Sequence, residues 1–241
     1  MDSNEEDIFT PSFPAPTTLR PLLGLTVLVI EDSRYACEAM RLLCLRSGAR
    51  IRRADSIRAA KRHLKVYRPS VAIIDLGLPD GNGSDLIAEL LAATPRPEVL
   101  LGLSGDPERQ TEAMNAGADG FLAKPLASLS EFQEAILAHL PVDRRPRGPR
   151  LAPNDTITPD PIAYRDDMAH VADVLDGRED DKVVDYVAQF LSGVARSAHD
   201  DALASAAEKL ALKRAQGLSA SSELDFLAGL VQARLSEKVA I

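Results

Sequence analysis

Four short apolar runs in the sequence each end in a charged or hydroxyl side chain, and this pattern constrains the fold more than any other feature. The clearest run is Val71 to Ile74, which Asp75 follows directly. A run this short and this rich in Val and Ile indicates a strand buried on both faces rather than a helix. The other runs, each with the residues that follow it, are 26–30 (Glu31 and Asp32), 99–103 (Ser104) and 120–123 (Lys124).

Helix-forming stretches separate these strands along the first half of the chain. The predicted strands cover about residues 26–30, 49–53, 70–74, 98–103 and 119–123, and the predicted helices about 33–47, 56–66, 84–93, 107–116 and 128–140. Such alternation is typical of a parallel sheet with helices on both faces, and right-handed crossovers place the carboxyl end of every strand on one rim. The predicted fold class is therefore α/β, a doubly wound five-stranded parallel sheet in the flavodoxin-like order 2-1-3-4-5.

The predicted rim brings together three carboxylates, those of Glu31, Asp32 and Asp75. An acid at the end of a strand can be a metal ligand, a base or a nucleophile, or it can simply cap the next helix. Three clustered carboxylates repel one another unless a cation lies among them, and hard oxygen ligands suit Mg²⁺. The sequence therefore predicts a magnesium site at this rim.

The order of these features resembles the receiver domain of bacterial response regulators over about residues 25–140. The shared features are the acidic pair, Asp75 followed by a Leu-Pro-Asp-Gly turn at 78–81, Ser104, an aromatic residue at Phe121, and Lys124 before a proline. The resemblance implies a two-component response regulator that accepts a phosphoryl group from a histidine kinase or a histidine phosphotransfer protein. It implies no enzymatic activity beyond the chain's own phosphorylation and dephosphorylation.

The resemblance also implies a role for each residue of the rim. Asp75 is the expected phosphoacceptor, and Asp75 with Lys124 forms the expected catalytic pair. The expected Mg²⁺ ligands are Asp32, Asp75 and the backbone carbonyl of Gly77, with Glu31 acting through water. These residues together would hold the metal and the transferred group.

The expected switch lies beside the rim. Ser104 is expected to contact the phosphoryl group together with Lys124, and Phe121 to turn inward when Ser104 moves. Gly102 interrupts the fourth strand, and Gly105 stands where the family often has Ala. Both glycines are expected to loosen the backbone next to the switch.

Two proline-rich segments flank the predicted receiver domain. Residues 1–24 contain four prolines and little periodicity, which predicts a disordered tail. Residues 141–161 contain six of the 16 prolines and four arginines, which predicts a stiff, exposed linker. The acidic start is unlike a signal peptide, and no segment has the roughly 20 apolar residues of a membrane helix, so we expect a cytoplasmic protein without a membrane partner.

Residues 162–241 contain no proline and are predicted to form a smaller all-α domain. Val184, Val187, Leu191 and Val194 follow a 3-4-3 spacing, which gives one helix an apolar seam. So short a segment with few aromatic residues has a small core. We therefore expect the seam to pack against a second copy in a homodimer or against a downstream partner protein.

Three output functions stay open from the sequence, and a protein-interaction or dimerisation module is the preferred one. The first alternative is a phosphorelay intermediate in which a helical histidine, His199 or His170, accepts the phosphoryl group. The Lys and Gly that usually follow such a histidine are absent after His199. The second alternative is an atypical DNA-binding regulator. With 9 Lys+Arg against 14 Asp+Glu, residues 162–241 carry a net charge of −5, which disfavours DNA.

Overall fold

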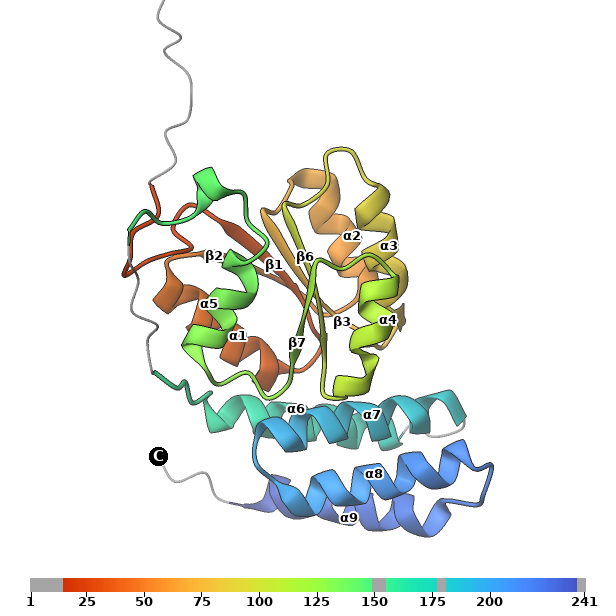
Figure 1. Ribbon diagram of the computed structural model, residues 1–241. Coiled ribbons are helices and arrows are strands. Elements are labelled where there is room, and N and C mark those ends of the chain that lie inside the picture. Colours follow the sequence, from red (N-terminus) through yellow and green to blue (C-terminus); the bar gives the residue numbers. More distant parts are fainter. Residues whose placement is uncertain (1–14, 149–154, 177–180, 238–241) are drawn as a thin grey trace, which may run out of the picture.

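The computed structural model describes residues 15–148, 155–176 and 181–237. A five-stranded parallel sheet forms the centre of the N-terminal domain (Figure 1). Its strands are β1 (Thr26–Ile30), β2 (Arg50–Ala54), β3 (Val71–Asp75), β6 (Val99–Ser104) and β7 (Gly120–Ala123). They lie in the order β2-β1-β3-β6-β7, so both the predicted fold class and the predicted strand order are confirmed. The two-residue strands β4 (Gly77–Leu78) and β5 (Gly81–Asn82) pair in the turn after Asp75.

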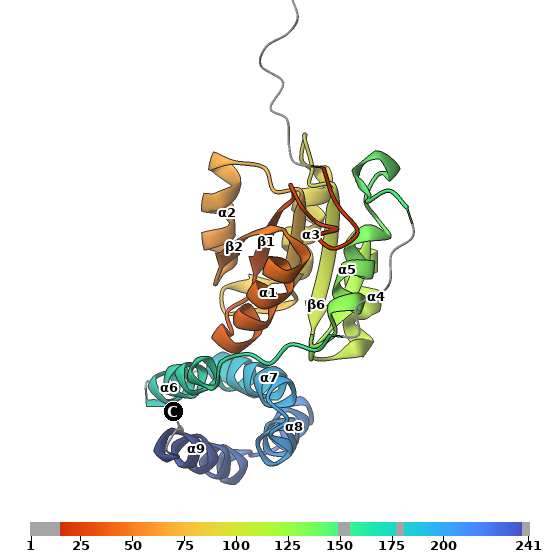
Figure 2. The ribbon, with the colours of Figure 1, turned by 90° about the vertical axis from the view of Figure 1, so that its left-hand side faces the viewer.

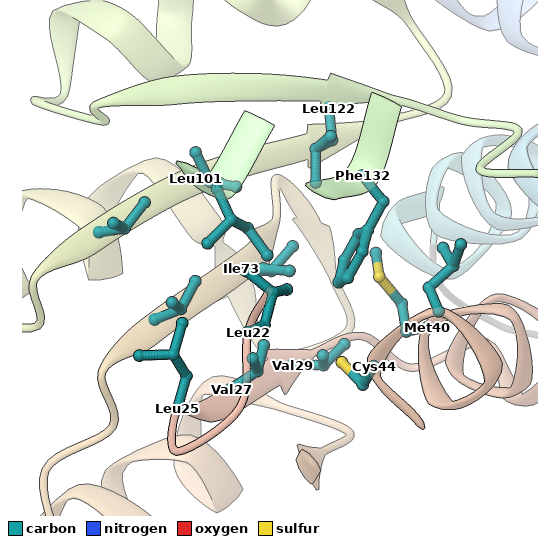
Figure 3. Close-up of a cluster of buried hydrophobic side chains, with 14 of the residues drawn as sticks. Leu22, Leu25, Val27, Val29, Met40, Cys44, Ile73, Leu101, Leu122 and Phe132 are labelled. Carbon is teal, nitrogen blue, oxygen red and sulfur yellow. The ribbon is translucent and has the colours of Figure 1, made fainter. Parts of the chain in front are cut away.

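Helices cover both faces of this sheet. The helices of the domain are α1 (Arg34–Ser47), α2 (Ile57–Val66), α3 (Gly83–Ala92), α4 (Gln110–Asn115) and α5 (Leu129–Leu137), with 3₁₀ turns η1 (Pro107–Arg109) and η2 (Val142–Arg144). Alternate residues of β1 point to opposite faces, so Val27 and Val29 pack under α1 and α5, whereas Leu28 and Ile30 pack under α2 and α3. Figure 3 shows the first of these cores around Phe132. Burial on both faces explains why β1, β3 and β6 read as nearly continuous apolar runs.

Both flanking segments are more closely attached to the N-terminal domain than the sequence indicates. Leu22 is fully buried in the core of Figure 3, and its N–H donates to the carbonyl of Ser47 at 3.0 Å. Ile157 is also buried in this core, and its N–H donates to the carbonyl of Ala127 at 2.9 Å. The prediction of a disordered tail is therefore wrong around Leu22, and that of an exposed linker is wrong around Ile157. Residues 1–14 and 149–154 lie outside the described residues.

In the described residues after 160, four helices form the C-terminal domain, so the predicted all-α domain is confirmed. They are α6 (Pro161–Asp176), α7 (Asp181–Ser197), α8 (Asp201–Ala215) and α9 (Ser221–Ser236). Each helix packs against the next, and α9 returns to α6, so the four close into a ring around their own apolar core (Figure 2). In the described part of the chain, none of the helices is long and apolar enough to cross a membrane.

The predicted seam on α7 lies inside this bundle. Val187, Leu191 and Val194 are buried in its core, and Val184 packs against that core. The prediction that the seam pairs with a second chain is therefore wrong, because the helices of the same chain already cover it. The bundle has its own polar anchor as well, since Asp200 caps α8 and accepts from Arg234 Nε at 2.6 Å and from the Tyr164 hydroxyl at 2.8 Å. The Arg234 hydrogen bonds lower the pKa of Asp200 to about 2.

Candidate functional site

The three predicted carboxylates do lie together at the rim. Glu31 and Asp32 follow β1, and Asp75 ends the neighbouring strand β3. One oxygen from each of the three side chains lies within 4.8 Å of the others. Glu31 and Asp75 are 1% and 6% exposed, so these acids are held away from bulk water.

Lys124 enters this cluster from the end of β7. Its Nζ lies 2.6 Å from Glu31 Oε2 and 2.9 Å from Asp75 Oδ2. Burial by itself would lower the pKa of Lys124, but the charges of Asp75 and Glu31 outweigh it and raise the pKa, so the side chain is an ammonium ion. The cluster therefore contains one ammonium group and three carboxylate groups.

Burial and mutual repulsion raise the pKa values of Glu31 and Asp32. Desolvation raises the pKa of Glu31 well above its usual range, and the Lys124 charge opposes this only in part. Desolvation also raises the pKa of Asp32 to about 6, with the Asp75 charge adding to it. A divalent cation would relieve both effects. The donor set fits Mg²⁺, because it consists of clustered carboxylate oxygens, and the buried Glu31 Oε2 has an ion pair but no hydrogen bond within the described residues.

The predicted switch residues lie beside the cluster. Ser104 ends β6, is buried, and accepts a hydrogen bond from the Asp106 N–H at 3.1 Å. Phe121 is half-buried against the core below α4. Close packing explains the glycine at position 102, which the sequence does not reveal. A Cβ there would lie 2.6 Å from the Cβ of Ala113 and 3.3 Å from the Phe121 ring.

The sequence gives no indication that α7 crosses this site. The Tyr186 hydroxyl donates to Asp32 Oδ2 at 2.6 Å. The Gln189 carboxamide lies against the Gly77 backbone, where an added Cβ would be 2.1 Å from Gln189 Nε2. At the end of β6, an added Cβ on Gly105 would lie 3.2 Å from the Cα of Gly193. The helical domain thus rests on the rim, as Figures 1 and 2 show.

A buried carboxylate on α6 fixes this arrangement. Asp167, 1% exposed, accepts from the Ser33 hydroxyl at 2.7 Å, the Arg34 N–H at 2.7 Å and the Tyr35 N–H at 3.1 Å. Since free N–H groups at the start of a helix need acceptors, Asp167 serves as a cap for α1 from the other domain. Desolvation raises the pKa of Asp167, although these hydrogen bonds oppose the rise.

Two cavities flank α7 where it crosses the rim. One of about 740 Å³ is lined by Asp75, Ser104, Lys124, Gln189, Ser192 and Arg196 among others. The other, of about 840 Å³, is lined by Asp32, Arg53, Asp167, His170 and Tyr186 among others. The acidic cluster is therefore open to small molecules on both sides of the helix.

The histidine considered as a phosphotransfer residue does not face Asp75. His199 lies in the turn between α7 and α8 with φ +56°, so the prediction that it lies on a helix is wrong. It lines a separate cavity of about 100 Å³ with Tyr35 and Ile157. His170 is on α6, as expected, with its ring edge against Phe190. The residue of α7 that lies at the Gly77 loop is Gln189.

Replacing Lys124 by Ala is expected to destabilise the N-terminal domain in metal-free buffer by about 3 kcal/mol, because Glu31 is then buried without a counter-charge. The pKa of Glu31, already raised in the folded state, rises further without Lys124. An acid whose pKa is raised in the folded state stabilises the fold at low pH. This stability is lost as the pH rises from the pKa of the acid in the unfolded state to its pKa in the folded state. Urea unfolding in EDTA should show a larger deficit at about pH 8 than at about pH 5.

The exposed pair Lys61–Glu89 provides a control for this prediction. Lys61→Ala should change the free energy of unfolding by at most about 0.5 kcal/mol at either pH, because exposed ion pairs contribute little. A Lys124→Ala protein with the same deficit at both pH values would contradict the assigned coupling to Glu31.

Comparison with known proteins places this site in a family. Residues 27–137 match the family model of the response regulator receiver domain. Similar proteins include the KDP operon transcriptional regulatory protein KdpE of Escherichia coli, 29% identical over 46% of this chain and 48% of that protein. The virulence transcriptional regulatory protein PhoP of Salmonella typhimurium is 30% identical over 42% of this chain and 46% of that protein. The chain thus matches about half the length of these curated relatives.

Two solved structures are each similar to about half of this chain. A putative response regulator from Chloroflexus aurantiacus is 28% identical, with a TM-score of 0.44, over 47% of this chain and 98% of that one. A response regulator protein from Burkholderia pseudomallei is also 28% identical, with a TM-score of 0.41, over 50% of this chain and 68% of that one. The family match coincides with the part of the chain that forms the parallel sheet and carries the acidic cluster. Residues 27–137 of this chain are therefore a response regulator receiver domain.

Proposed function

We propose that Asp75 accepts a phosphoryl group from a histidine kinase or a histidine phosphotransfer protein. An oxygen of Asp75 forms the new bond to phosphorus, the bond from phosphorus to the donor imidazole breaks, and a proton returns to that imidazole. The observation that carries this proposal is the contact of Lys124 Nζ with Asp75 Oδ2 at 2.9 Å inside a cluster of three carboxylates. The chain then catalyses only its own phosphorylation and dephosphorylation, as a cytoplasmic protein.

The other residues of the rim stabilise the transferred group. Lys124 neutralises charge on the phosphoryl oxygens, and the Ser104 hydroxyl donates to one of them. Mg²⁺, held by Asp32, Asp75 and the Gly77 carbonyl with Glu31 behind a water molecule, would supply further positive charge. Phe121 follows the movement of Ser104 because it packs beside Gly102 on the neighbouring strand.

We further propose that the helical domain reads the state of Asp75. A phosphoryl group adds roughly −1.5 to −2 charges and three strong acceptors at a point that α7 now covers. Tyr186 is bonded to Asp32, and Gly193 lies close to Gly105, the residue after Ser104. Movement of the Ser104 loop would therefore disturb the contact with α7 and release the bundle to a downstream partner protein.

A DNA-binding output is the second candidate. Two of the similar proteins are named transcriptional regulators, but the family match ends at residue 137 and does not include the helical domain. The bundle's net charge, 9 Lys+Arg against 14 Asp+Glu, opposes a polyanion. A phosphorelay through His199 is disfavoured because that side chain lines a different cavity from Asp75.

One experiment tests both the acceptance of a phosphoryl group by Asp75 and the response of the helical domain. The protein is treated with acetyl phosphate and Mg²⁺, the modified peptide is mapped, and hydrogen exchange is followed in α6 and α7. We expect a hydroxylamine-sensitive label on Asp75 and faster exchange where α6 and α7 contact the rim. A label on another residue would refute acceptance by Asp75, and unchanged exchange in a labelled protein would refute the proposed output. Salt-sensitive binding of the labelled protein to duplex DNA would favour the second candidate.

A further inference from the structure

One side chain of the helical domain occupies an unusual place beside Asp75. Gln189 lies on the face of α7 that also carries Tyr186 one turn before it and Gly193 one turn after it. Both neighbours are fixed to the rim, Tyr186 by its 2.6 Å hydrogen bond to Asp32 and Gly193 by its approach to Gly105. The contacts of Tyr186 and Gly193, one turn before and one turn after Gln189, therefore fix its position over the rim.

The carboxamide of Gln189 reaches the loop that follows Asp75. It contacts the backbone of Gly77 so closely that a Cβ there would be 2.1 Å from Nε2 and 2.7 Å from Cδ. The Gly77 N–H in turn donates to Asp75 Oδ1 at 3.3 Å. Gln189 and Asp75 line the same cavity of about 740 Å³, which is large enough for a phosphoryl group and water. The carboxamide thus borders the space that a phosphoryl group on Asp75 would enter.

The basic side chains that line this cavity already have partners. Arg196 is bound to Glu208, and Arg109 to Glu112. Lys124 is bound to Glu31 and Asp75. The Gln189 carboxamide, by contrast, makes no hydrogen bond with any residue of the described segments, and its side chain is exposed to solvent at the mouth of the cavity. One carbonyl acceptor and two N–H donors are therefore free beside Asp75.

We propose that Gln189 is a catalytic residue for hydrolysis of the phosphoryl group on Asp75, a proposal that rests on phosphorylation of Asp75. Its carbonyl oxygen accepts from the attacking water, and its amide donates to a phosphoryl oxygen. Glutamine side chains orient water for attack on a phosphoryl group in other phosphoryl-transfer proteins, where catalysis is mainly positioning. The water oxygen forms a bond to phosphorus, the bond from phosphorus to Asp75 breaks, and a water proton passes to the departing inorganic phosphate.

This assignment gives the contact between the two domains a function. With α7 on the rim, the carboxamide is in place and the phosphoryl group is short-lived. With the helical domain released, water is not oriented and the phosphoryl group persists. Contacts that hold α7 on the rim, above all those of Asp167, therefore shorten the lifetime of the phosphorylated state.

The test measures loading and decay separately in the full chain. The protein is phosphorylated with acetyl phosphate and Mg²⁺, the donor is removed, and release of inorganic phosphate is followed. Gln189→Ala should slow decay at least about tenfold, because orientation of a reactant contributes one or more orders of magnitude. Ser192→Ala, on the same helix and the same cavity, is the matched control and should decay like the wild type.

The outcomes separate this proposal from its alternatives. If Gln189→Ala loads faster but decays at the wild-type rate, Gln189 only obstructs the site and the proposal is overturned. Equal slowing by Ser192→Ala would overturn it as well, because the effect would then belong to the cavity in general. A protein that takes up no label on Asp75 would refute the proposed function itself, whereas a labelled protein with unchanged decay refutes only the role of Gln189.

A double variant tests whether Gln189 acts through the docked helix. Asp167→Ala, which removes the cap that α6 provides to α1, should also slow decay. Combining it with Gln189→Ala should give no further slowing, because residues that act as a unit are not additive. Slowing equal to the product of the two single effects would overturn the dependence on docking.

Discussion

Asp75→Asn is expected to abolish the hydroxylamine-sensitive label from acetyl phosphate. The amide has nearly the shape of the carboxylate but lacks its charge and its nucleophilic oxygen. Lys124 keeps Glu31 as a partner at 2.6 Å, so the variant should remain folded. Intact mass and peptide mapping before and after treatment with acetyl phosphate and Mg²⁺ provide the measurement.

Asp80 supplies the matched control for this result. It lies in the same loop, but its two oxygens accept from the N–H groups of Ile57 and Arg58 at 2.8 and 2.9 Å, outside the acidic cluster. Asp80→Asn should therefore retain the label at the wild-type level. Label that persists in Asp75→Asn, or that is lost equally in Asp80→Asn, would show that the acceptor has been assigned to the wrong residue.

Asp167→Ala is expected to release the helical domain from the receiver. The change removes three hydrogen bonds to a buried carboxylate, from the Ser33 hydroxyl and from the N–H groups of Arg34 and Tyr35. Hydrogen bonds to charged groups contribute about 1.5 to 3 kcal/mol each, so a total loss of about 4 kcal/mol is a conservative expectation. This corresponds to roughly a thousandfold shift of the docking equilibrium.

Hydrogen exchange and small-angle scattering would measure this release. The amides of Arg34 and Tyr35 should exchange faster, and the radius of gyration should rise. Asp166→Ala is the control, because among the described residues Asp166 makes only an exposed ion pair, with Arg34 at 2.9 Å. Exposed pairs contribute at most about 1 kcal/mol, so this variant should stay docked. If both variants behave alike, the buried cap is not what holds the domains together.

The sequence alone determined the receiver domain and its acidic cluster. Each strand is a short apolar run that needs burial on both faces, which is a local property of the chain. The handedness of the crossovers then brings the strand ends to one rim. Asp32, Asp75 and Lys124 therefore lie together, although Asp75 is 43 residues from Asp32 and 49 residues from Lys124 in the sequence. The grouping of these acidic side chains with Lys124 at the strand ends was therefore predictable without knowledge of any tertiary contact.

The contacts between the domains have no such local signal. The Tyr186 and Asp32 side chains are 154 residues apart in sequence, and Asp167 and Ser33 are 134 apart. Tyr186 and Asp167 are single polar residues on helices, without the periodicity that identifies a buried face. The same holds for Gln189, which is exposed and differs from other surface glutamines only by its place over Gly77.

Packing also decided features that the sequence left ambiguous. The apolar seam of α7 could have joined two chains, but closure of α6 to α9 into a ring buries it within one. Gly105, expected only to loosen the backbone, allows the close approach of Gly193. The sequence thus determined which residues form the phosphoryl-acceptor rim, because their pattern is local. Only the tertiary structure decided which residues cover that rim, because such contacts depend on how the helical bundle fits against the edge of the parallel sheet.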